Sequence, residues 1–286
     1  MGQRLDRVVV LPPTESLAPR IISDYERALH SDGRRQLGLF AIEGFRLLER
    51  ALATSTPLTH VLISDQADHD PSSRLQTLLQ NLQKKNQTIL TIPQSTMERL
   101  TEGRTLGSIL ALAKIPTTPD LPQFFSQLSL GPQSKILVLD EMMDPGNVGA
   151  LLRTSHAMGV SAVFAIGGTD PYHPRAARTS MGSIFRVPIL RLPSVDPLLP
   201  LFNLHNIFTI GATPESQTLL PSATLPNQAF ALFVGNEGKG LSSSVRKVLD
   251  LLVAIPMSNS IDSLSINAAT AVILYAMTHP SKPLKP

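Results

Sequence analysis

The chain has 286 residues, of which 42% are hydrophobic and 16% are charged, and its formal net charge is +3. It contains no cysteine, which excludes disulfides, thiolate metal sites and cysteine nucleophiles. The length suffices for about two domains with sizeable cores, and the mild charge limits any nucleic-acid surface to a local basic patch.

The N-terminal region lacks the charged and apolar pattern of a signal peptide. No stretch approaches the roughly 20 apolar residues of a membrane span. We therefore expect a cytoplasmic protein.

The first half of the chain alternates short apolar runs with stretches of helical spacing. Residues 1–20 carry three prolines and little periodicity, which predicts a flexible arm. From residue 21 to residue 114 the alternation predicts an α/β sandwich. The expected helices are 21–29, 45–52, 75–82 and 95–100, and the expected strands are 39–42, 61–63, 89–92 and 107–112.

Three prolines, Pro116, Pro119 and Pro122, predict a linker over residues 115–134. Residues 135–286 form the second expected domain. Its strands are near-continuous apolar runs, typical of a parallel sheet covered on both faces. They are expected at 136–139, 162–166, 187–190, 207–210, 230–234 and 251–255, with a long buried helix from about Ser263.

Three junctions of this second domain carry polar groups where a strand meets a helix. The first follows the strand at 136–139 and reads Asp144-Pro145-Gly146-Asn147-Val148-Gly149 before a helix that carries Arg153. Ligands of parallel sheets bind at such junctions, because the first N–H groups of the helix are unpaired. The alternative is structural: Asn147 as a helix N-cap and Arg153 as a solvated side chain.

The second junction is Val234-Gly235-Asn236-Glu237-Gly238-Lys239-Gly240, which follows a buried strand. Glycine suits a backbone that must approach a ligand or adopt positive φ. The loop is not a Walker A motif, and the chain has no G-x-G-x-x-G. A solvent-facing turn is the structural alternative.

The third junction runs from Ile255-Pro256-Met257 to a helix that begins near Ser263 and carries Ser265, Asn267 and Thr270. Core hydrogen bonding is one explanation of these polar groups, and a ligand at the junction is the other. At the edge of one parallel sheet, the three junctions can build a single cleft.

Together, these three motifs resemble those of the SpoU-type RNA 2′-O-methyltransferases of the SPOUT superfamily, in the same order. In the first half, Phe40-Ala41-Ile42-Glu43-Gly44 resembles a segment of that family's N-terminal substrate-binding domain, which is related to the L30e/L7Ae RNA-binding fold. The resemblance implies a deep trefoil knot in the second domain, S-adenosylmethionine as cofactor, and a homodimer.

The resemblance also implies roles for individual residues. The positions that match catalytic ones are Arg153, Asn147, Glu237 and Ser263, with Ser265 where the family usually has asparagine. The positions that match cofactor-binding ones are Gly235, Asn236, Gly238, Ile255, Met257 and Leu264. No metal site is implied, and the seven histidines show no paired ligand spacing.

The role of Arg153 follows from its chemistry, since a guanidinium keeps its proton in proteins. We expect it to hold an RNA phosphate and to polarise the ribose hydroxyl; proton acceptance by Arg153 is the alternative. Ser265 reaches less far than asparagine, which leaves room for altered substrate use or weakened catalysis.

The basic side chains expected to contact RNA are Arg34, Arg35, Arg175 and Arg178. Transfer to ribosomal RNA is the expected activity, because relatives with an L30e-like domain mostly act on it. The alternatives are a tRNA 2′-O-methyltransferase and a non-catalytic, ribosome-associated RNA-binding protein of the same fold.

Overall fold

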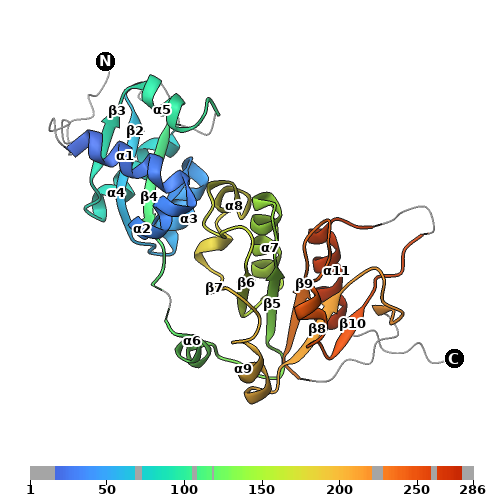
Figure 1. Ribbon diagram of the computed structural model, residues 1–286. Coiled ribbons are helices and arrows are strands. Elements are labelled where there is room, and N and C mark those ends of the chain that lie inside the picture. Colours follow the sequence, from blue (N-terminus) through green and yellow to red (C-terminus); the bar gives the residue numbers. More distant parts are fainter. Residues whose placement is uncertain are drawn as a thin grey trace. The chain divides into compact units, whose positions relative to one another are not determined.

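The architecture comes from a computed structural model in which residues 17–67, 73–104, 108–117, 119–220, 228–258 and 263–278 are described. These residues form two compact units, each built around its own sheet (Figure 1). The first unit comprises the described parts of 1–116 together with 172–185, and the second comprises 117–171 and the described parts of 186–286. Sequence patterning assigned 172–185 to the second domain, so this boundary differs from the expected one.

The first unit is an α/β fold with a four-stranded sheet of order β1-β4-β2-β3. Strand β4 is antiparallel to β1 and β2, and β2 is parallel to β3. The strands are β1 (Leu39–Glu43), β2 (Leu58–Ser64), β3 (Ile89–Ile92) and β4 (Ile109–Lys114). The helices are α1 (Leu17–Leu29), α2 (Ser31–Leu37), α3 (Phe45–Ala53), α4 (Ser73–Lys84), α5 (Gln94–Leu100) and α8 (Pro174–Thr179), with a 3-10 turn at Ser183–Phe185.

Helices α1 and α5 pack on one face of this sheet through the apolar stripes that predicted them. Ile21, Tyr25 and Ala28 of α1 join Met97 and Leu100 of α5 in one buried cluster with strand residues. Helix α1 begins four residues before the expected helix, inside the expected arm, and residues 1–16 lie outside the described residues.

Helix α2 lies between the expected helix at 21–29 and the expected strand at 39–42, where no helix was expected. A Cβ at Gly33 would lie 2.0 Å from the carbonyl oxygen of Arg27, so only glycine permits the close packing of α2 on α1. The segment is therefore a short helix fixed by a tertiary contact that periodicity does not reveal.

The second unit has a six-stranded sheet of order β10-β8-β9-β5-β6-β7, and every pairing is parallel, as the apolar runs predicted. The strands are β5 (Lys135–Asp140), β6 (Ala162–Ile166), β7 (Ile189–Leu192), β8 (Phe208–Ala212), β9 (Phe230–Val234) and β10 (Leu251–Val253). The helices are α6 (Leu121–Gln127), α7 (Pro145–Ala157), α9 (Leu199–Leu204), α10 (Ser243–Arg246) and α11 (Ile266–Thr278).

The expected linker contains helix α6, which is part of the core. Asp120 caps this helix by accepting from the Gln123 N–H, and Phe124 and Phe125 are buried in one cluster with Phe164. A stretch expected to be only a connection is thus a packed element of the second unit.

Helix α7 buries its stripe of Val148, Leu151 and Leu152 and packs against α11, which also contacts β9 (Figure 1). Helix α11 was expected to be buried all round, and this expectation is wrong for the single chain. Val272 is 43% exposed and Tyr275 is 58% exposed. Within the described residues, no helix is long and apolar enough to cross a membrane.

Candidate active site

The carboxyl ends of the parallel strands meet at one edge of the second sheet, and a cavity of about 500 Å³ lies there. The segments that follow β5, β8, β9 and β10 all contribute to its lining. Of the expected catalytic and cofactor-binding residues, the cavity brings together all except Arg153. Those that line it are Asn147, Gly235, Asn236, Glu237, Gly238, Ile255, Met257, Ser263, Leu264 and Ser265.

The glycine loop after β9 is closed by its own backbone. Asn236 and Gly240 exchange backbone hydrogen bonds of 3.0 and 2.8 Å, and the Asn236 side chain accepts from the N–H groups of Gly238 and Lys239. A Cβ at Gly235 would lie 2.2 Å from the carbonyl carbon of Gly240. The loop can therefore be this tight only with glycine at position 235.

Two contacts hold this loop against the end of β5. Asp140 accepts hydrogen bonds from the backbone N–H of Ser242 at 2.7 Å and from its hydroxyl at 3.2 Å. The Asn236 amide donates to the carbonyl of Glu141 at 3.1 Å. Burial raises the pKa of Asp140, and the bonds from Ser242 partly oppose that rise.

Asn147 and Glu237 meet at the cavity across 90 residues of sequence. The Asn147 amide donates to the Glu237 carboxylate at 2.8 Å. The N-cap of α7 is Asp144, which accepts from the Asn147 N–H at 2.8 Å. The structural alternative for Asn147, that its side chain caps the helix, is therefore wrong, and its amide points to the acidic side chain of the glycine loop.

Arg153 lies further along α7 and is exposed. It does not line the cavity. Six residues of helix separate it from Asn147, a rise of about 9 Å. Its guanidinium thus belongs to the open surface beyond the cavity and not to the cavity wall.

The third junction ends in a capped helix. Ser265 directly precedes α11, and its hydroxyl accepts from the Ala268 N–H at 3.3 Å while its carbonyl accepts from Ala269. Asn267 accepts a hydrogen bond from the hydroxyl of Thr154 at 2.7 Å. Asn267 therefore joins α11 to α7.

The segment after β8 also contributes to the cavity, which was not expected from the sequence. Thr213 and Glu215 line the cavity, and both accept hydrogen bonds from Arg246 of α10, at 3.2 and 2.7 Å. The signal was available: Thr213-Pro214 ends a strand of the same parallel sheet, and ligand sites gather at such ends. Arg246 gave no comparable signal, because it sits in an ordinary polar helix.

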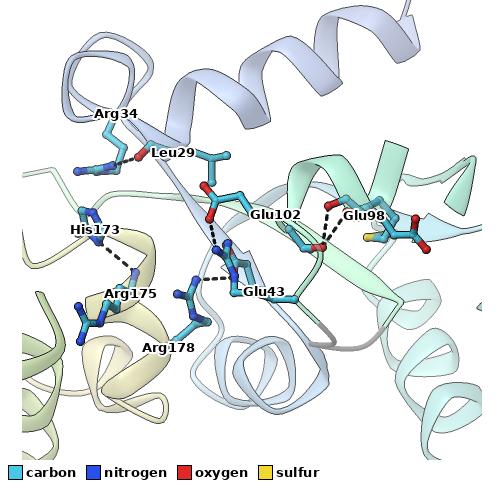
Figure 2. Close-up of polar contacts among 11 residues, drawn as sticks. Leu29, Arg34, Glu43, Glu98, Glu102, His173, Arg175 and Arg178 are labelled. Atoms are coloured by element: carbon cyan, nitrogen blue, oxygen red, sulfur yellow. Dashed lines mark hydrogen bonds and ion pairs between the residues drawn. The ribbon is translucent and has the colours of Figure 1, made fainter. Parts of the chain in front are cut away.

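The basic residues expected to contact RNA have different environments. Arg34 is buried, so the expectation that it contacts RNA is wrong. That residue is 1% exposed, and its guanidinium donates to the carbonyls of Ala28 and Leu29 at the end of α1 (Figure 2). Arg34 thus satisfies carbonyls that the helix leaves unpaired, and it is removed from the surface. Arg35 and Arg175 are exposed.

Arg178, on α8, donates to the buried carboxylate of Glu43, which also receives Arg104 at 3.4 Å (Figure 2). The Glu43 side chain is fully buried, so its charge needs these two partners. The role of Arg178 therefore includes holding residues 172–185 within the first unit.

Comparisons with known proteins give a consistent result. The model of the SpoU rRNA Methylase family matches residues 134–275, and that of the RNA 2′-O ribose methyltransferase substrate binding domain matches residues 41–119. The chain is 33% identical to the 23S rRNA (guanosine-2′-O-)-methyltransferase RlmB of Pasteurella multocida over 71% of this chain and 83% of that protein.

Two further matches cover nearly the whole length. The 23S rRNA (guanosine(2553)-2′-O)-methyltransferase RlmP of Bacillus subtilis is 28% identical over 91% of this chain and 97% of that protein. The crystal structure of the SpoU methyltransferase AviRb from Streptomyces viridochromogenes, in complex with AdoMet, superposes with a TM-score of 0.79 at 22% identity, over 91% of this chain and 97% of that chain.

Proposed function

The chain belongs to the SpoU rRNA methylase family, and on that premise we propose that it transfers a methyl group to a ribose 2′-hydroxyl of ribosomal RNA. It is an RNA ribose 2′-O-methyltransferase that uses S-adenosylmethionine. The observation that carries the proposal is the cavity at the sheet edge, where Asn147 of one junction bonds Glu237 of another. We expect the enzyme to act in the cytoplasm.

The cavity suits this cofactor in size and in chemistry. Its volume of about 500 Å³ lies in the range of small-molecule sites. Apolar side chains such as Ile255, Leu264 and Ile273 offer a wall for a flat ring, and Glu215 and Arg246 offer charges of both signs for an amino-acid end. When bound, S-adenosylmethionine supplies an electrophilic methyl group on a sulfonium.

Within this cavity the chain's residues have to position the ribose hydroxyl and manage its proton. Glu237 is exposed at the cavity and holds one bond from Asn147, which leaves carboxylate lone pairs for a further donor. We propose that Glu237 and Asn147 orient the hydroxyl for in-line approach, and that Ser263 and Ser265 add hydrogen bonds. Orientation of this kind supplies much of the rate of direct methyl transfer without a covalent enzyme intermediate.

Arg153 takes a different part in this proposal. Its exposure outside the cavity fits a side chain that meets the RNA strand as it approaches, with a guanidinium suited to a phosphate. The phosphate beside the target ribose would then be held on α7, and the positive charge would also favour the ionised hydroxyl.

A homodimer formed through the second unit is part of the proposal. Val272 and Tyr275 lie one helical turn apart on α11, and both expose large hydrophobic side chains. An exposed apolar surface of this kind is typical of a protein–protein interface. A second copy of the chain would cover them. Light scattering should give a dimer, and Tyr275→Asp should shift it toward the monomer.

The finer fold assignments are also proposals. We propose that the second unit contains a deep trefoil knot, supported by the described residues after β8, β9 and β10, which line one cavity. We also propose that the first unit is L30e-like. Its helices alternate with strands along the chain, and its four-stranded sheet is mixed, which supports this proposal.

The experiment pairs calorimetric binding of S-adenosylmethionine with transfer of labelled methyl groups to RNA. The RNA should come from a strain that lacks the gene, with ribosomal RNA and tRNA separated. Binding together with ribose methylation of ribosomal RNA is the expected result. Methylation of tRNA alone would overturn the ribosomal substrate, and binding without transfer to either would favour the non-catalytic alternative.

A matched pair of variants tests the site itself. Arg153→Gln should reduce methyl transfer and leave cofactor binding unchanged, because Arg153 does not line the cavity. Gly235→Ala should abolish cofactor binding, because its Cβ would displace the backbone of Gly240. Equal loss of cofactor binding in both variants would contradict the separate roles.

A further inference from the structure

A second concave site lies in the first unit. It encloses about 370 Å³ above the end of β1, and residues 172–185 form part of its wall. Its lining combines cationic and apolar side chains: Phe45, Arg46, Leu47, Arg74, Arg178 and Met181, together with Glu43 and Gly44.

The charge of this site is positive after its internal pairs are counted. Glu43 is the carboxylate of the lining, and it is fully buried and paired with Arg104 and Arg178. The Tyr25 hydroxyl adds no negative charge, because an ordinary tyrosine is already neutral near pH 7, and burial, followed by the nearby Glu43, raises its pKa further. Arg46 is exposed, and among the described residues it has no hydrogen-bond acceptor.

The site also offers flat and polarisable surfaces. The Arg74 guanidinium lies 5.9 Å from the centroid of the half-buried Phe45 ring and is fixed there by two 2.7 Å hydrogen bonds to Glu49. Planar guanidinium groups and aromatic rings are the surfaces on which unstacked RNA bases pack.

Met181 adds an exposed apolar side chain, and its backbone conformation is strained. Its φ is +51°, in the left-handed region that a residue with a long side chain rarely adopts, and it is 43% exposed. Gly182 follows at φ +91°, and a Cβ there would lie 2.7 Å from the side chain of Arg50. Strained residues of this kind gather at binding sites, and core packing does not explain an exposed one.

We propose that this site, formed by Phe45, Arg46, Arg74 and Met181 above the Glu43–Arg178 pair, binds a single-stranded segment of the substrate RNA. A phosphate contacts Arg46, and a neighbouring base packs on Phe45 and Met181. The inference rests on the proposed function, since it names a docking site for the substrate of that reaction. Charge complementarity and the aromatic surface favour RNA over an apolar peptide.

The test measures binding of a fluorescein-labelled oligouridylate to the full-length protein by anisotropy, over a series of salt concentrations. Arg46→Gln should weaken binding about tenfold and lower the slope of log K against log salt by about 0.7, the value for one phosphate contact on a single strand. The control is Arg99→Gln, which removes the same charge from an exposed residue outside the site, and it should have a smaller effect on both quantities.

A second variant separates binding from folding. Met181→Gly removes the backbone strain, so its melting temperature should stay equal or rise, while RNA binding weakens about tenfold from the lost base contact. A fall in melting temperature with unchanged RNA binding would assign Met181 a structural role and overturn the proposal.

Methyl transfer by the unaltered protein separates failure of the RNA-docking site from failure of the proposed methyltransferase function. If it methylates RNA, and Arg46→Gln and Met181→Gly bind oligouridylate as Arg99→Gln does, the docking site is wrong and the proposed function stands. If the unaltered protein neither binds S-adenosylmethionine nor methylates any RNA, the proposed function itself fails. If it methylates RNA and only the two site variants lose RNA affinity, both inferences are supported.

Discussion

The two units differ in how they accommodate the negative charge of a glutamate. In the first unit, Glu43 is fully buried and held by the guanidinium groups of Arg104 and Arg178. In the second unit, Glu237 is exposed at the cavity and held by the neutral amide of Asn147. A buried carboxylate must have its charge compensated to be tolerated, whereas an exposed one keeps free acceptor positions for a ligand. Glu43 therefore organises structure, and Glu237 is available for chemistry.

The largest expected effect tests the buried side of this comparison. Glu43→Ala removes the buried carboxylate that pairs with Arg178 and, beside Glu102, with Arg104, and it should reduce the free energy of unfolding by about 3 kcal/mol. Urea denaturation followed by circular dichroism measures it. Glu43→Gln, which keeps the shape and removes the charge, is the matched control and should lose less. An unchanged unfolding curve for Glu43→Ala would show that the pair contributes nothing to stability.

For the exposed Glu237, we expect a loss of activity without a loss of stability. Glu237→Gln should lower the rate of methyl transfer about 100-fold, close to 2.7 kcal/mol of transition-state free energy, because the group that we propose to orient the hydroxyl loses its charge. Its urea denaturation should match that of the unaltered protein. A variant that keeps full turnover, or that unfolds as easily as Glu43→Ala, would break the comparison.

Asp140 lies between the two cases, since it is buried and, within the described part of the chain, is held by neutral donors of Ser242. Burial raises its pKa in the folded state. The folded chain therefore binds this proton more tightly than the unfolded chain, and folding gains from it as the pH falls. That gain is complete below the unfolded pKa of about 3.9 and is lost as the pH rises through the higher folded pKa.

The prediction for Asp140 concerns the slope of stability against pH. In Asp140→Asn the titrating group is absent, so the difference in unfolding free energy between the unaltered protein and the variant should shrink as the pH rises above about 3.9. Urea denaturation at a series of acidic pH values measures this difference. A difference that grows with pH would mean that the bonds from Ser242 outweigh burial.

The smallest effect comes from an exposed ion pair. Hydrogen bonds from Arg74 lower the pKa of Glu49, so this pair stabilises the fold above the unfolded pKa of Glu49, and the gain is lost as the pH falls through the lower folded value. Both side chains are more than a third exposed, which limits the gain to about 0.5 kcal/mol. Glu49→Gln should remove it at neutral pH and leave stability at pH 2 unchanged, as thermal melts can show.

Most elements of the fold could be predicted, because their signals are local. Strands β3 (Ile89–Ile92), β6 (Ala162–Ile166) and β9 (Phe230–Val234) have the expected bounds, and the other expected strands lie within a few residues of theirs. Helix α6 and helix α2 were missed, since proline spacing and a glycine resemble a linker and a turn until tertiary contacts are known.

The candidate site was predictable to the same extent and for the same reason. The three polar junctions are each contiguous in sequence, and the parallel sheet brings their ends to one edge. The parts that were missed depend on contacts between elements: Arg246 at the cavity, Asn267 with Thr154, and the burial of Arg34. Nothing in the residues next to these positions distinguishes them from ordinary polar side chains.

The parallel α/β character of the second unit and the polar motifs at its strand ends can be read from local sequence, because periodicity and turn residues act over a few positions. Which distant groups meet depends instead on the tertiary fold. Asn147 reaches Glu237 across 90 residues, and Glu43 meets Arg178 across 135. A charge is buried or exposed according to such long-range partners, so the contrast between Glu43 and Glu237 could not be seen before folding placed them.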